Sequence, residues 1–181
     1  MAEAQPNPAP LVLRLAYAAA VLAVSWYVMM AVHELGHALA AIATGGGVER
    51  IVLPLLGFSR TDIAPNPQPL GVAWAGPIAG VVLPVLLFMI AKLALRKRCH
   101  LAQQTLCFFA GLCLLSNGVY LGLGWLDRVG DAGDLLRHGA SVWQLIVFGA
   151  LSSAAGLWFW HRLGPWLGLA SPRDAHRTAA P

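Results

Sequence analysis

Four long apolar stretches constrain this chain more than any other feature of its sequence. They cover residues 11–44, 71–95, 101–126 and 141–169, and each is long enough for the roughly 20 residues that an α-helix needs to cross a bilayer. Only 11% of the residues are charged, against about 25% in a typical soluble domain. The sequence therefore predicts an all-α polytopic membrane protein with about four transmembrane helices.

The segment that joins the first two stretches differs from them in composition. It reads "VERIVLPLLGFSRTDIAPNPQP", which is apolar and β-branched at first and then rich in Pro and Asn. We expect a short membrane-edge β-hairpin over residues 48–63, followed by a loop. The glycines of "TGGG" at residues 44–47 are typical of the end of a helix. The first helix would be about 50 Å long, so it must tilt, bend or protrude.

The length of the chain favours one integral membrane domain over residues 1–181, with a polar tail at 170–181. We interpret the first stretch as a retained span because it is much longer than the apolar part of a signal peptide. Four spans place both termini on one side, which carries most of the basic residues, and the positive-inside rule makes that side cytoplasmic. The end of the first span and the third loop share the opposite side.

The charged residues argue against nucleic-acid binding, and the cysteines argue against a cysteine-based site. The formal net charge of +4 comes from Lys and Arg at the ends of apolar stretches, without the basic surface that nucleic-acid binding needs. Cys99, Cys107 and Cys113 are odd in number and form no C-x-x-C pair. Neither a nucleic-acid partner nor a cysteine-based metal site or disulfide framework is therefore indicated.

His33, Glu34 and His37 place three ionisable groups inside the first apolar stretch. Such groups are costly in lipid and by default mark a functional site. Two histidines four residues apart lie on one face of a helix, and the H-E-x-x-H pattern is that of zinc peptidases, with the glutamate as general base. The structural alternative is a hydrogen-bonded core cluster, which would bury three polar groups at a cost of several kcal/mol.

A catalytic zinc usually takes three protein ligands, so a third must come from elsewhere in the chain. The third loop, "WLDRVGDAGDLLRHG", offers Asp127, Asp131 and Asp134 on the side where the first span ends. Each of the three has a structural alternative as a solvated or helix-capping aspartate. The remaining histidines lie on the opposite side, in the tail, or downstream of the acids: His100, His161, His176 and His138.

Three motifs in this order resemble the site-2 protease family of intramembrane zinc metalloproteases. "HELGHALA" at residues 33–40 is similar to the family's first motif, "AGPIAG" at 75–80 to its A-G-P motif, and "DAGDLLR" at 131–137 to the D-G-G-x-x-L stretch that supplies its third ligand. The resemblance covers a core of about residues 11–137 and leaves the span at 141–169 outside. It implies a compact member, since no segment resembles a PDZ domain.

The resemblance implies roles for individual residues. Zn²⁺ would be held by His33, His37 and Asp131, with Glu34 as the base. Asn117 would take the place of an asparagine that the family uses to hold the substrate or its oxyanion, although it stands further upstream with no Pro before the aspartate. Ala132 replaces the first glycine of the third motif, so Asp127 and Asp134 stay open as ligands. Bacterial members open their site to the cytoplasm, opposite to the orientation that the basic residues favour.

The expected function is hydrolysis of peptide bonds in membrane-embedded or membrane-adjacent proteins or peptides, in a multi-pass protein surrounded by lipid. Substrates with helix-weakening residues are expected, because a helical peptide group is tied up in backbone hydrogen bonds. Residues 48–63 would either pair with an extended substrate or only cover the site, and the small residues at 75–80 would let helices approach closely. A zinc-binding or zinc-transporting protein and a catalytically inactive scaffold are the alternatives.

Overall fold

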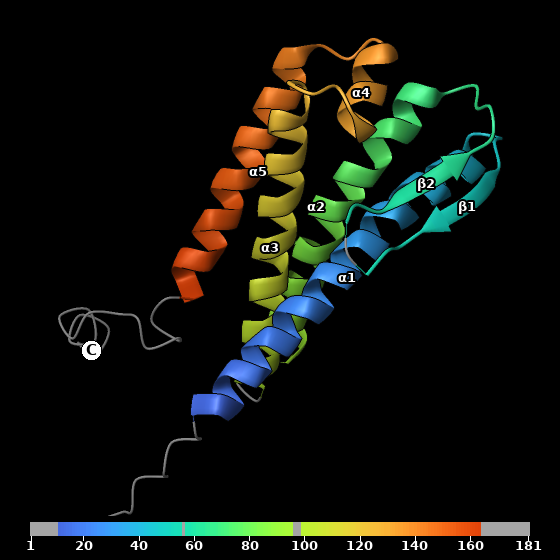
Figure 1. Cartoon of the computed structure of the whole chain (residues 1–181). Helices are drawn as coiled ribbons and strands as arrows, with labels where there is room; N and C mark the ends of the chain where they lie inside the picture. Colours follow the sequence, from blue (N-terminus) through green and yellow to red (C-terminus); the bar gives the residue numbers. More distant parts are fainter. Residues whose placement is uncertain (1–10, 56, 96–98, 164–181) are drawn as a thin grey trace, which may run out of the picture.

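Among residues 11–55, 57–95 and 99–163, which the computed structural model describes, four helices are long and apolar enough to span a membrane. They are α1 (Leu11–Ala43), α2 (Pro69–Ala94), α3 (His100–Gly124) and α5 (Val142–Leu163) (Figure 1). The predicted helical membrane fold is thus confirmed. Residues 164–169 of the predicted fourth span, the tail at 170–181 and the basic residues 96–98 lie outside the described residues.

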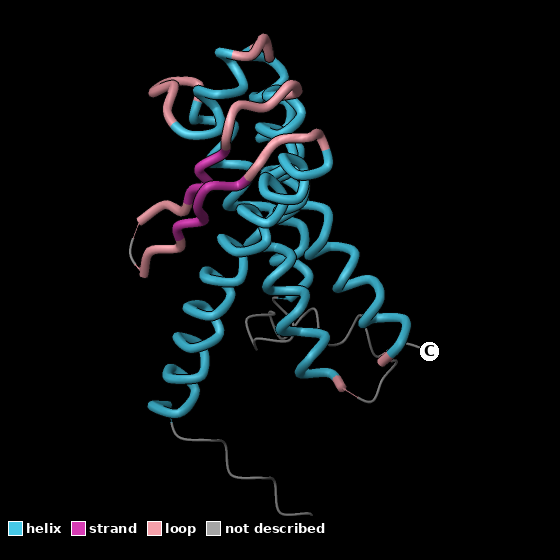
Figure 2. Tube along the Cα trace, turned by 90° about the vertical axis from the view of Figure 1, so that its right-hand side faces the viewer, coloured by secondary structure: helices cyan, strands magenta, loops and turns pink. Residues whose placement is uncertain are grey.

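Helix α1 is the longest element and lies obliquely to α3 and α5 (Figure 1). Its first half diverges from the other helices (Figure 2), and most side chains before Ser25 are exposed. The helix ends as the "TGGG" run predicts. Gly45 has φ +85°, and the N–H groups of Gly45 and Gly46 donate to the carbonyls of Ile42 and Ala41 at 3.1 and 2.9 Å, which is a Schellman motif.

The predicted hairpin is present as β1 (Val48–Val52) and β2 (Arg60–Ile63), paired antiparallel with Ile51 opposite Thr61. Contacts from the segments that flank its strands help to hold it beside α1. The Tyr27 hydroxyl donates to the Leu53 carbonyl at 2.9 Å, and the Asn66 amide donates to the Ala41 carbonyl at 3.1 Å. These contacts place β2 along the second half of α1, where the histidines lie (Figure 1).

The third loop contains a short helix, α4 (Gly130–Arg137), that the sequence did not indicate. The chain turns into it through Arg128 and Gly130, with φ +54° and +56°. The helix buries Ala132 and Leu135 in a cluster with Leu121 of α3. A Cβ at Gly133 would lie 2.8 Å from the Arg128 carbonyl carbon, so only glycine fits this turn. Packing of α4 brings Asp131, in its first turn, next to His33 of α1.

Helices α3 and α5 pack side by side along glycines, which form what we call the scaffold seam: Gly118, Gly122, Gly149 and Gly156. A Cβ at Gly122 would lie 2.9 Å from the Gly149 Cα, and one at Gly156 would lie 2.8 Å from the Gly111 carbonyl oxygen. Backbones can approach this closely only where side chains are absent. The seam fixes α3, which carries two residues of the site described next.

Candidate metal centre

His33, Glu34 and His37 lie in the last third of α1, and all three side chains are buried. Helix α2 crosses α1 at this level, with Gly76 against the His37 ring: a Cβ at Gly76 would coincide with the ring atoms. A Cβ at Gly80 would lie 2.7 Å from the Asn117 side-chain oxygen. The glycines of "AGPIAG" therefore make room for side chains of the site as well as for a neighbouring helix. We call Gly76 and Gly80 the site seam.

Three ligand-type atoms from α1 and α4 converge on one point. His33 Nε2 lies 2.7 Å from Asp131 Oδ2, His37 Nε2 lies 3.2 Å from Asp131 Oδ1, and the two Nε2 atoms are 3.1 Å apart. Donors about 2.0–2.1 Å from a tetrahedral zinc are separated by roughly 3.3 Å. The three separations are slightly smaller than that, so a small movement of the side chains would admit an ion.

Hydrogen bonds fix the tautomer of both rings. His37 Nδ1 must donate to the Val72 carbonyl, 2.8 Å away, because a carbonyl only accepts. The Asn117 amide nitrogen donates to the Cys113 carbonyl at 2.8 Å, which turns the Asn117 oxygen toward His33 Nδ1 at 2.7 Å. With both Nδ1 atoms protonated, a neutral ring has only a lone pair at Nε2. Metal-binding histidines are usually oriented in this way by their second nitrogen.

The shared point therefore attracts positive charge. Two Nε2 lone pairs and a carboxylate repel one another unless a proton or a metal cation lies between them. Burial raises the pKa of the Asp131 carboxyl, but a proton shared between this carboxyl and the Nε2 atoms of His33 and His37 lowers the pKa by more, to well below its usual range. Asp131 is thus a carboxylate at neutral pH. Two imidazoles and one carboxylate suit zinc.

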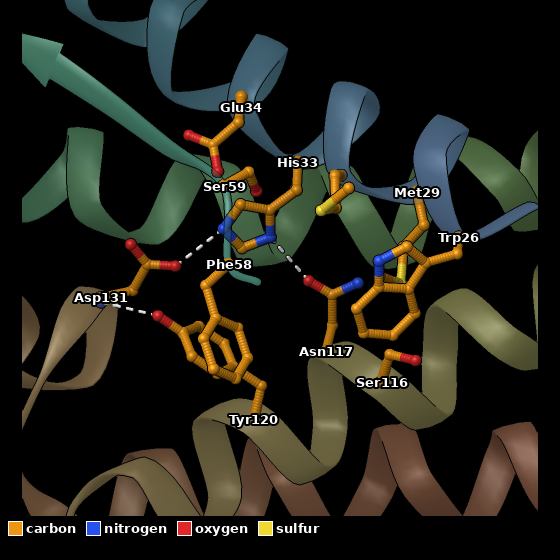
Figure 3. Close-up of a pocket in the computed structure, with 11 residues that line it drawn as sticks. Trp26, Met29, His33, Glu34, Phe58, Ser59, Ser116, Asn117, Tyr120 and Asp131 are labelled. Carbon is orange, nitrogen blue, oxygen red and sulfur yellow. Dashed lines mark hydrogen bonds and ion pairs between the residues drawn. The ribbon is translucent and has the colours of Figure 1, made fainter. Parts of the chain in front are cut away.

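Glu34 is held by the hairpin. The Thr61 hydroxyl, on β2, donates to Glu34 Oε2 at 2.7 Å. Among the described residues Oε1 has no hydrogen-bond partner, and no fully buried side-chain oxygen or nitrogen is left without one. Glu34 lines two cavities at the site, so Oε1 can contact water there. Figure 3 shows the Glu34 carboxylate on the same side of His33 as Asp131.

Tyr120 supports Asp131 from α3. Its hydroxyl accepts the Asp131 backbone N–H at 3.3 Å, and its ring stacks on Phe58, with centroids 5.9 Å apart. The loop before β2 and the start of α4 thus meet over one aromatic side chain (Figure 3).

Two cavities of different character meet at the site. The larger has a volume of about 840 Å³ and is lined mainly by polar residues of β2, the following loop and α4, together with Glu34 and His37. The smaller has a volume of about 90 Å³ and lies between α1 and α3 next to His33 (Figure 3). Glu34, Ser59, Tyr120 and Asp131 line both. The larger cavity is wide enough to hold water beside Glu34 and Asp131.

The other candidate acids and histidines that the structure describes lie apart from the point shared by His33, His37 and Asp131. Asp127 is exposed in the turn after α3, and Asp134 forms an ion pair with Arg137. His138 is exposed and lines the large cavity. His100 begins α3 and His161 lies near the end of α5, both far from α4 (Figure 1), and His176 lies outside the described residues.

Three supporting groups were not found by sequence reasoning: Thr61, Tyr120 and the Val72 carbonyl. Tyr120 lies three residues after Asn117 on α3, so helical spacing was a usable signal for it. A threonine in a four-residue strand and a backbone carbonyl have no such signal.

Comparison with known proteins gives one match. A family model described as Peptidase M50B-like matches residues 6–127, about two thirds of the chain. The match includes the histidines, Glu34, the "AGPIAG" segment and Asn117, and it ends before Asp131. No curated protein and no solved structure matches the chain. The convergence of Asp131 on the histidines is therefore an observation independent of the match.

Proposed function

This chain belongs to the Peptidase M50B-like family, and from that premise we propose that it is an intramembrane zinc metalloprotease. It is a multi-pass membrane protein of a metallopeptidase family, and its proposed substrates are membrane-embedded or membrane-adjacent proteins or peptides. One observation carries the proposal: His33, His37 and Asp131 converge on a point beside the Glu34 carboxylate.

The donor set fits a zinc ion. His33 and His37 would offer their Nε2 lone pairs and Asp131 a carboxylate oxygen, which leaves a fourth position toward the cavities. When bound there, zinc would supply Lewis acidity, activating a water molecule and polarising a carbonyl group. The hydrogen bonds at Val72 and Asn117 hold the two rings in the required tautomer.

Glu34 is the proposed general base and acid. Thr61 occupies Oε2, so Oε1 is the atom that takes a proton from the attacking water and returns it to the leaving nitrogen. Because the Thr61 hydroxyl comes from β2, the hairpin orients the base as well as covering the site. A substrate helix must unwind locally before its peptide group can reach Glu34, since that group is bonded within the helix.

Asn117 is proposed here as a positioning residue for His33. Both ends of its amide are occupied by the protein, the oxygen by His33 and the nitrogen by the Cys113 carbonyl. These two bonds fix the orientation of the amide and leave its nitrogen one further N–H. The support of His33 is thus a role beyond the one that the family resemblance implies, and it explains why Gly80 leaves space at this point.

The test compares two glutamate-to-glutamine changes. Glu34→Gln should keep zinc bound but lower cleavage of a co-expressed membrane substrate by about 10²–10⁴-fold, which is the usual contribution of a general base. Glu49→Gln is the matched control, because Glu49 also lines the large cavity but is exposed on β1; it should leave cleavage unchanged. Unchanged cleavage in Glu34→Gln with zinc retained would contradict the proposal and favour a zinc-binding or zinc-transporting function.

A further inference from the structure

The smaller cavity has walls that differ from the rest of the site. On α1, Trp26, Met29 and Met30 precede His33 by seven, four and three residues, so all four lie along one face of the helix. Ser116 and Asn117 of α3 form the facing wall, and Phe58 closes one end. Figure 3 shows the labelled ones, Trp26, Met29, Phe58, Ser116 and Asn117, around a common space beside His33. We call this space the side-chain chamber.

The chamber is suited to an apolar group. Its walls away from the metal centre are mostly thioether and aromatic surface from Trp26, Met29, Met30 and Phe58. The Asn117 amide, which also lines it, already bonds to His33 and to the Cys113 carbonyl and offers one remaining N–H. A polar substrate side chain would lose hydration here without a full set of partners, which costs free energy. Methionine walls also adapt to branched shapes.

The volume of the chamber favours a small occupant. A cavity of about 150 Å³ accommodates a benzene molecule, whereas the chamber has about 90 Å³. This smaller volume favours an aliphatic side chain over an aromatic ring. The large cavity on the other side of the metal centre has about 840 Å³ and sets no such preference.

Resting on the proposed function, we propose that the side-chain chamber is a specificity subsite for one aliphatic side chain next to the scissile bond. The residue on the other side of that bond faces the large polar cavity and is not selected by size. The enzyme therefore cuts beside Ala-, Val- or Leu-sized residues and discriminates against aromatic and charged residues at one flanking position only.

A substrate scan tests the asymmetry. Each residue flanking the cleaved bond of a membrane-anchored substrate is replaced in turn by Ala, Leu, Phe and Asp, and kcat/KM is measured. One position should favour Ala and Leu over Phe and Asp by about 10-fold or more, the usual discrimination of an apolar pocket, and the other should vary little. Equal tolerance at both positions would overturn the proposal.

Substitutions in the wall of the side-chain chamber should change which flanking residues the enzyme prefers. Ser116→Leu fills the chamber and should lower the Leu:Ala ratio by about 10-fold, whereas Met29→Ala enlarges it and should raise the Phe:Ala ratio by a similar factor. Val119→Leu on α3 and Val28→Ala on α1 are matched controls, since both positions are exposed and outside the chamber. If both wall variants cleave the substrates with wild-type ratios, the chamber does not select them.

A cross-linking experiment separates this proposal from the proteolytic function. Ser116→Cys is combined with Glu34→Gln and with Cys99→Ser, which removes the exposed natural thiol. A substrate with cysteine at the size-selective position, or scanned across the cut site if none is cleaved, should form a disulfide with residue 116 under mild oxidation. A cross-link with no proteolysis by the wild type would support the chamber and contradict the function; absence of any cross-link would overturn the chamber proposal.

Discussion

The glycines of α2 and those between α3 and α5 have the same lack of a side chain but different neighbours. In the site seam, Gly76 faces the His37 ring and Gly80 faces the Asn117 amide. In the scaffold seam, the neighbours of Gly122 and Gly149 are backbone atoms of the opposite helix. A methyl group added to the first seam would displace functional side chains, and one added to the second would separate two helices. A Gly→Ala change in the site seam should therefore lower activity, whereas one in the scaffold seam should lower the stability of the fold.

The largest effect is expected for Gly76→Ala. The added Cβ would occupy the position of the His37 ring, so the ring must move away from its partners, and a displacement of about 1 Å can lower activity 100-fold. The protein should stay folded but lose most of its zinc and at least about 100-fold of its proteolysis. Gly71→Ala is the matched control on the same helix, because its Cβ would meet open space.

Asn117→Ala is expected to have the next largest effect. It removes the acceptor that orients His33, and loss of such a partner typically lowers metal affinity or activity 10–100-fold. Zinc competition with a chelator measures the affinity, and Asn117→Asp, which keeps an acceptor, should restore part of it.

A double variant tests whether the lack of a side chain at Gly80 makes room for the Asn117 amide. Gly80→Ala alone should lower zinc affinity, since its Cβ would lie within 3 Å of the Asn117 amide. In an Asn117→Ala background the same change should add little, because the obstructing side chain is gone. If the losses of zinc affinity in the two single variants add up in the double variant, this role of Gly80 is contradicted.

Gly149→Ala should act on stability instead. Its Cβ would lie 2.7 Å from the Gly118 carbonyl oxygen and closer still to Gly122, and overpacking of this kind costs about 1–3 kcal/mol. Thermal unfolding in detergent should shift to lower temperature, while zinc content per folded chain remains that of the wild type. If Gly149→Ala loses zinc but keeps the thermal stability of the wild type, the two seams do not have the different roles described here.

The smallest effect is expected at the ion pair that joins Arg50 and Asp62 across the two strands of the hairpin. Hydrogen bonding from Arg50, with Arg60 nearby, holds the pKa of the Asp62 carboxyl below its usual range. Its stabilising contribution is therefore complete above the unfolded-state pKa of about 3.9 and is lost as pH falls through the lower folded-state pKa. Because exposed ion pairs contribute little, Asp62→Asn should leave unfolding and proteolysis unchanged between pH 5 and pH 8, roughly. A marked change in either property would show that this ion pair contributes to the stability of the fold or to the activity of the site.

The sequence was sufficient where the determining interactions are local. The spans follow from runs of apolar residues, the end of α1 from "TGGG", and the shared face of His33 and His37 from their four-residue spacing. Asp131 was selected only by family resemblance, because the turn that aims it depends on α4. That helix forms where Ala132 and Leu135 pack against α2, α3 and α5, which no local pattern encodes.

The partners of the site were harder to predict because they join distant parts of the chain. Asn117 and His33 are 84 residues apart, and Thr61 and Glu34 are 27 apart. Asn117 was selected as a residue for the substrate, and only its two hydrogen bonds in the fold indicate that it supports His33. The glycines of "AGPIAG" were correctly associated with close packing, but the side chains that they accommodate became evident only in three dimensions.

The most direct test is the zinc content of the purified wild-type protein, measured beside Asp131→Ala and the exposed-acid control Asp127→Ala. A shared site at His33, His37 and Asp131 predicts about one zinc per chain in the wild type and in Asp127→Ala, and almost none in Asp131→Ala. Full zinc stoichiometry in Asp131→Ala, or a wild-type protein that binds none, would contradict the metal centre on which the proposed chemistry depends.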